Sequence, residues 1–186
     1  MFNLSHDSTI RIVTSRQLTQ ESPDVRRDVY DSHRHRVFAL AFYMTGNEIA
    51  AEEVLTSTFV NAFSQSDRPD AGLVDSALVS ELRQRFPLDR NEPAPDLQAA
   101  SNAKADLGQR NVRRTDLEEA IQTLPAGERL LFLLRDVEGY SPAAIAELLQ
   151  MPEAKVQRGL FWARVRLRRA LAADSVEELE AEPDAA

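Results

Sequence analysis

Residues 124–171 constrain the fold of this chain more than any other segment, because several helix signals follow one another at short intervals. An apolar run over residues 128–137 predicts a buried helix, and Gly139 supplies a turn after it. Ser141 is a suitable N-cap, and Pro142 follows at the first helical position, where its missing N–H costs nothing. A short Ala-rich helix, a tight turn and a long basic helix complete the pattern. This order predicts a helix-turn-helix.

The last helix of this segment concentrates positive charge. Its cations are Lys155, Arg158, Arg164, Arg166, Arg168 and Arg169, and its first acid is Glu153. The whole chain is acidic, with a formal net charge of −8. A basic helix in an acidic chain predicts a polyanionic partner, and DNA is the polyanion that a helix-turn-helix fits. Because the rest of the chain is acidic, we expect local DNA contacts, with a larger partner supplying much of the affinity.

Composition excludes several classes of protein. The chain has 186 residues, 43% of them apolar, which is enough for one ordinary domain or two small ones. It has no cysteine, which excludes disulfides and thiolate metal sites. No apolar run approaches the ~20 residues that span a bilayer, and the N-terminus lacks the pattern of a secretory signal. We therefore expect a cytoplasmic protein.

Signatures of catalysis and of metal or cofactor binding do not occur in the sequence. It contains no Gly-rich phosphate loop and no Ser/His/Asp pattern, so we expect neither an enzyme nor a cofactor. His33 and His35 are two residues apart on a predicted helix and point to different sides, which makes them poor co-ligands. We expect no metal site.

The pattern of apolar residues and breaks divides the chain. Helical periodicity without β alternation predicts an all-α protein, in which two small helical domains are joined by a flexible linker and the second is the helix-turn-helix. The predicted parts are a mobile N-terminal arm (1–22), a first helical domain (23–87), a linker (88–114), a second domain (115–173) and an acidic tail (174–186). The linker is rich in Pro and polar residues and has too little aliphatic content to build a core.

Helix boundaries can be predicted from particular residues. Asn47 can cap a helix over residues 48–65, and a shorter helix is predicted over residues 73–86. In the second domain, Thr115 with Glu118 resembles a capping box. On the last helix, Phe161 and Trp162 are adjacent and cannot both face one core, so we expect one of them to be more exposed.

The predicted roles on the basic helix follow from its position in a major groove. Side chains near its N-terminus would reach base edges, and those further along would meet phosphates. The base-reading candidates are Glu153, Ala154, Lys155, Gln157 and Arg158; the phosphate candidates are Arg164, Arg166, Arg168 and Arg169. The alternative is a basic, solvated helix in a plain helical bundle.

These motifs carry a resemblance to a known family. Residues 117–171 resemble region four of the bacterial sigma-seventy family, in its small two-domain extracytoplasmic-function type. The matching elements are Leu124-Pro125, Asp136 to Gly139, Ile145 to Glu147, and Ala163 to Arg168. The resemblance implies a promoter-specificity subunit of RNA polymerase, whose last helix enters the minus-thirty-five element.

Residues 30–63 are similar, less sharply, to region two of the same family. The shared features are the Thr45-Gly46 turn, the Ala-Glu-Glu-Val-Leu start of the next helix, and Thr58-Phe59. The resemblance implies that this helix grips core RNA polymerase, with Glu52, Glu53 and Thr56 as contacts. The alternative for the two acids is that they only favour a helix N-terminus. Such sigma factors are often held by an anti-sigma inhibitor protein, which is a further implied partner.

The sequence departs from the family after residue 66. Where the family has an aromatic start and several basic residues that help to melt the promoter, this chain keeps only Arg83 and Arg85 as candidates for the downstream promoter element. Gly159 to Trp162 and Ser57 also differ from the usual pattern. Two other hypotheses therefore stay open: a sigma-like regulator that no longer initiates transcription, and a protein-interaction module whose basic helix binds an acidic partner.

Overall fold

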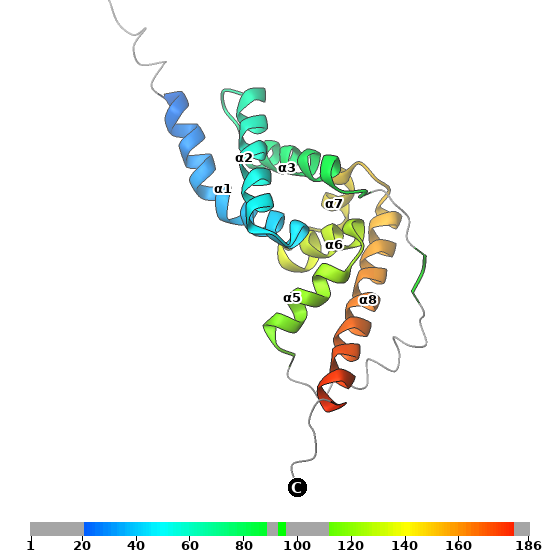
Figure 1. Cartoon of the computed structure of the whole chain (residues 1–186). Coiled ribbons are helices and arrows are strands. Elements are labelled where there is room, and N and C mark those ends of the chain that lie inside the picture. Colours follow the sequence, from blue (N-terminus) through cyan, green and yellow to red (C-terminus); the bar gives the residue numbers. More distant parts are fainter. Residues whose placement is uncertain (1–20, 89–92, 96–111, 181–186) are drawn as a thin grey trace, which may run out of the picture.

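The computed structural model describes residues 21–88, 93–95 and 112–180, with side chains placed from residue 25 to residue 172 within these ranges. Every regular element in this part of the chain is helical, which confirms the all-α prediction (Figure 1). The elements are α1 (Glu21–Thr45), α2 (Glu48–Gln65), α3 (Ala71–Arg85), α5 (Arg114–Thr123), α6 (Ala126–Phe132), the π-helix η1 (Leu133–Val137), α7 (Pro142–Leu149) and α8 (Glu153–Glu180). None of the described helices is both long and apolar enough to cross a membrane.

Most of the predicted N-terminal arm and linker lies outside the described residues, as do the last six residues of the predicted tail. Helix α1 begins at Glu21, within the predicted arm, and α8 continues to Glu180, within the predicted tail.

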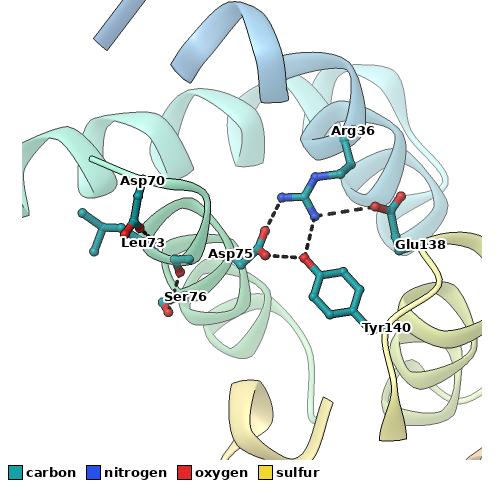
Figure 2. A network of polar contacts seen from close by, with 8 residues as sticks. Arg36, Asp70, Leu73, Asp75, Ser76, Glu138 and Tyr140 are labelled. Atoms are coloured by element: carbon teal, nitrogen blue, oxygen red, sulfur yellow. Dashed lines mark hydrogen bonds and ion pairs between the residues drawn. The ribbon is translucent and has the colours of Figure 1, made fainter. Parts of the chain in front are cut away.

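Helices α1, α2 and α3 pack together as a first helical unit. Its core includes Val37, Leu40, Met44, Val54 and Leu82, all at most 2% exposed. The cap predicted at Asn47 forms, and its side chain accepts a hydrogen bond of 3.0 Å from the N–H of Ala50. Helix α3 begins at Ala71, two residues before the predicted start, because Asp70 caps it by accepting a hydrogen bond of 2.8 Å from Leu73 (Figure 2).

Helices α5 to α8 form a second unit that contains the predicted helix-turn-helix. Ser141 caps α7 by accepting a hydrogen bond of 3.1 Å from Ala144, and Pro142 is the first helical residue. Gln150 ends α7 in the left-handed conformation, with φ of 51°, which turns the chain into α8. Ile145 and Val156 are fully buried where the two helices meet.

One local prediction in this unit is wrong, and a second is confirmed with a local irregularity. The capping box at Thr115 does not form, because α5 begins at Arg114 and Asp116 accepts the backbone hydrogen bond of Arg113 at 3.2 Å. The predicted helix over residues 128–137 is not regular: after α6 it widens into η1, in which the N–H of Glu138 donates to the carbonyl of Leu133 at 2.9 Å.

The two units pack against each other, and their buried residues form one continuous cluster. Helix α1 lies against α5 and α6, and α3 lies against α7 (Figure 1). Gly127 permits a close approach, because a Cβ at this position would lie 2.4 Å from the carbonyl oxygen of Leu88.

Arg129 is the polar centre of this contact. Its half-buried guanidinium donates to the Met44 carbonyl at 2.8 Å, to the Leu124 carbonyl at 3.0 Å and to the Gln122 side chain at 2.9 Å. It therefore satisfies carbonyls at the C-terminal ends of both α1 and α5, where a cation is favourable. Burial lowers the pKa of Arg129.

Candidate nucleic-acid interface

Helix α8 separates a buried face from a charged face. Val156, Leu160, Ala163 and Leu167 face the core of the second unit. Of the five predicted base-reading residues, Glu153, Ala154, Gln157 and Arg158 are exposed, while Lys155 is half-buried. The N-terminal half of α8 therefore presents side chains to solvent on the side away from the core, as a helix that enters a groove must.

Within this group the contacts differ. Gln157 donates to the carboxylate of Glu153 at 2.9 Å, so these two side chains form one hydrogen-bonded pair along the helix. Arg158 has no hydrogen-bond or ion-pair partner among the described residues. Phe161 is 50% exposed and Trp162 is half-buried, which confirms that one of the two adjacent aromatics is more exposed. Their ring centroids are 4.8 Å apart.

The four predicted phosphate-binding arginines fall into two pairs. Arg164 makes a double hydrogen bond with Asp136, at 2.7 and 3.2 Å, and this hydrogen bond raises the pKa of Arg164. Arg166 pairs with the Glu128 carboxylate at 2.9 Å and also donates to the Pro93 carbonyl. Arg168 and Arg169 are exposed, and no partner occurs for them in the described part of the chain. The first pair holds α8 in place, and the second is available to a ligand.

The predicted polymerase contacts lie on a stripe along the exposed face of α2. Glu52, Glu53 and Thr56 are exposed and line a shallow hollow with Ile49, which is 71% exposed. One turn further along, Val60 is 61% exposed. Exposed apolar side chains that flank acids on one helix are typical of a docking surface.

The structure does not bring the two predicted downstream-element residues together. Arg85 turns toward α2 and pairs with Glu53 at 3.2 Å, so a predicted DNA contact and a predicted polymerase contact neutralise each other. Arg83 instead donates to the carbonyl of Leu149, at the end of α7. In this arrangement both guanidinium groups have partners within the protein.

A polar network that the sequence did not reveal links the two units (Figure 2). Arg36 on α1 donates to the Tyr140 hydroxyl at 3.2 Å and lies 3.6 Å from the Glu138 carboxylate. Asp75 on α3 accepts from both Arg36 and Tyr140. Burial disfavours the charged form of Arg36, but the hydrogen bond and charge of Asp75 outweigh it and raise the pKa of Arg36. The sequence contains one indication of this network, which is that the charged residue Asp75 stands among the apolar positions of α3.

The structure contains little that could hold a metal. Among the residues that it describes, no three His, Cys, Asp or Glu side chains lie close enough together to coordinate one ion. The exposed surface of the described residues presents cations on α8 and an acidic, partly apolar stripe on α2.

Comparisons with known proteins agree with this geometry. The family model for sigma-70 region 4 matches residues 114–173, which span α5 to the middle of α8. The ECF RNA polymerase sigma factor SigW of Bacillus subtilis is 24% identical over 175 residues, covering 84% of this chain and 94% of SigW. The sigma factor RpoE of Bartonella quintana, solved with the anti-sigma factor NepR, has a similar fold. Its TM-score is 0.59 at 15% identity, and the match covers 81% of this chain and 98% of that one.

The helix-turn-helix, the region 4 match and the similarity to SigW over most of both chains agree with one another. Residues 114–173 match sigma-70 region 4, and most of the chain is similar in sequence to an extracytoplasmic-function sigma factor.

Proposed function

We propose that this chain is a promoter-specificity subunit that directs core RNA polymerase to initiate transcription. The observation that carries the proposal is α8, which projects Glu153, Ala154, Gln157 and Arg158 from the second helix of a helix-turn-helix. A helix placed in this way can enter the major groove with its N-terminal side chains against base edges. The chain would act in the cytoplasm and would make or break no bond itself.

Within α8 the proposal assigns two kinds of contact. Lys155 and Arg158, with their neighbours, would read bases of the minus-thirty-five element. Arg168 and Arg169 would bind phosphates and set the position of the helix. Arg164 and Arg166 could reach phosphates only by exchanging their present acidic partners, Asp136 and Glu128, for DNA.

On the first unit, the stripe on α2 would dock on core polymerase through Glu52, Glu53 and Thr56. The support for this is the exposure of the stripe and of Ile49 beside it. SigW is an RNA polymerase sigma factor by name, and RpoE was solved with an anti-sigma factor, so an inhibitor protein is a further proposed partner of this chain.

DNA recognition by both units requires them to part. Arg83, a candidate for the downstream element, is bonded to Leu149, which lies just before the recognition helix. While Arg83 is held beside the recognition helix, the two cannot reach the downstream and minus-thirty-five elements of one duplex at the same time. We therefore infer that the packed arrangement is a resting state, and that polymerase or promoter binding separates the units.

The direct test is transcription in vitro with purified core polymerase and a genomic promoter library. Promoter-dependent initiation that requires the chain is the expected result. Binding to core polymerase without initiation at any promoter would instead favour a regulator that has lost initiation, which the engagement of Arg83 and Arg85 within the protein would then explain. Tight binding of an acidic protein, with no salt-dependent DNA binding, would favour an interaction module.

A further inference from the structure

A cavity of about 320 Å³ lies where the end of the first unit meets the helix-turn-helix. The apolar side chains that line it include Leu131, Leu149, Met151 and Trp162. Leu88, which follows α3, also lines the cavity. A space of this size holds about ten water-sized groups, which is at the small end of ligand pockets.

Two glycines shape this cavity. A Cβ on Gly159 would lie 2.4 Å from the Cδ1 atom of Leu131, so a larger residue would displace the Leu131 side chain. Gly127 allows Leu88 to approach the start of α6 in the same way. Gly159 is also one of the residues at which the sequence departs from the sigma-seventy pattern that it resembles.

The cavity wall also carries positive charge. Arg83 comes from α3, whereas Lys155 and Arg158 come from the first turns of α8, and all three line the cavity. Glu128, the acid among the described lining residues, pairs with Arg166 at 2.9 Å. A wall with both apolar and cationic side chains is complementary to a molecule that has an apolar body and an anionic end.

We propose that this cavity binds a small amphiphilic anion, with an aliphatic or aromatic body and one carboxylate or phosphate group. The apolar body lies between Leu131 and Trp162, and the anionic group meets the guanidinium of Arg158. Because the wall includes residues of both helical units, the bound anion favours the packed arrangement. Where Lys155 and Arg158 also read DNA, as proposed above, the anion competes with the promoter; its binding alone does not depend on that function.

Decanoate is a suitable probe, and decanol is its uncharged control. Binding to the full chain is measured by calorimetry below the micelle-forming concentration of the probe. The fluorescence of Trp162, the single tryptophan of the chain, reports the place of binding. We expect saturable one-to-one binding of decanoate, a change in Trp162 fluorescence at the same midpoint, and binding of decanol that is at least threefold weaker.

Arg158→Gln should weaken decanoate binding by about threefold to tenfold, as expected for loss of a partly exposed charged contact. Arg168→Gln is the matched control, because it removes the same charge from the same helix outside the cavity, and it should bind as the unaltered chain does. Absence of one-to-one binding would overturn the proposal. Equal affinity for decanoate and decanol, or equal binding by the two variants, would overturn it as well.

Discussion

Arg129 offers the sharpest test of how the two helical units hold together. Arg129→Met keeps the apolar part of the side chain but removes the five hydrogen bonds that the guanidinium makes with described residues. Three of them, 2.8 to 3.0 Å long, go to Met44, Gln122 and Leu124, and the other two go to the carbonyls of Gln122 and Tyr43. Counting only the first three, at about 1 kcal/mol net for each bond, the free energy of unfolding should fall by about 3 kcal/mol. For a chain of this length that loss corresponds to a fall in Tm of about 6–12 °C.

Thermal unfolding followed by circular dichroism measures the loss, and small-angle scattering measures the separation of the units. Because the bond to Met44 crosses between the units, the variant should also have a larger radius of gyration than the unaltered chain. Arg27→Met is the control, since Arg27 is exposed and lies 3.8 Å from its nearest acid, Asp31, and it should change neither quantity measurably. An Arg129→Met protein with unchanged Tm and dimensions would refute the assignment of Arg129 as the link.

Three further predictions follow from the packing. Burial and the hydrogen bond to Asp75 raise the pKa of Tyr140 above its usual value of 10.0, so this hydroxyl stabilises the fold below pH ~10 and the stabilisation is lost as the pH rises further. Above pH ~10 the urea midpoint should therefore fall less steeply with pH in Tyr140→Phe than in the unaltered chain, and equal slopes would contradict this. Gly127→Ala should force Leu88 away and destabilise the chain by about 1–3 kcal/mol in urea unfolding. The control Gly72→Ala, whose Cβ would meet only Asp70 at an ordinary 3.5 Å, should be neutral or slightly stabilising. Equal effects of the two variants would show that the close approach at Gly127 is unimportant. Leu133→Ala, at a fully buried position, should lower the free energy of unfolding by about 2–5 kcal/mol, and a loss under 1 kcal/mol would place Leu133 outside the core.

Local chemistry made much of the fold predictable. Asn47 and Ser141 were predicted as caps and form them, because a side chain that accepts a nearby N–H acts within one turn of sequence. The helix-turn-helix was predicted for the same reason. Thr115 shows the limit of such signals, since Asp116 offers the same backbone a competing acceptor.

Pairs distant in sequence were not predictable. Arg164 and Arg166 were predicted from charge alone to face phosphates, yet acids 28 and 38 residues earlier in the chain engage them. The link from Arg36 to Tyr140 spans 104 residues, and a contact between residues so far apart leaves no periodic pattern in the sequence. Sequence patterns identified which side chains carry charge, but the packing of the two units decides which charges remain available.

The claim that the start of α8 reads promoter sequence is tested most directly by one ratio. The affinity of the polymerase-bound chain for a matched promoter is divided by its affinity for a scrambled one, at a fixed salt concentration, for the unaltered chain and for two variants. Arg158→Ala should lower this ratio by about 5- to 150-fold, corresponding to about 1–3 kcal/mol, whereas Arg168→Ala should weaken both affinities and leave the ratio unchanged. An equal loss on both DNAs from both variants would contradict the account.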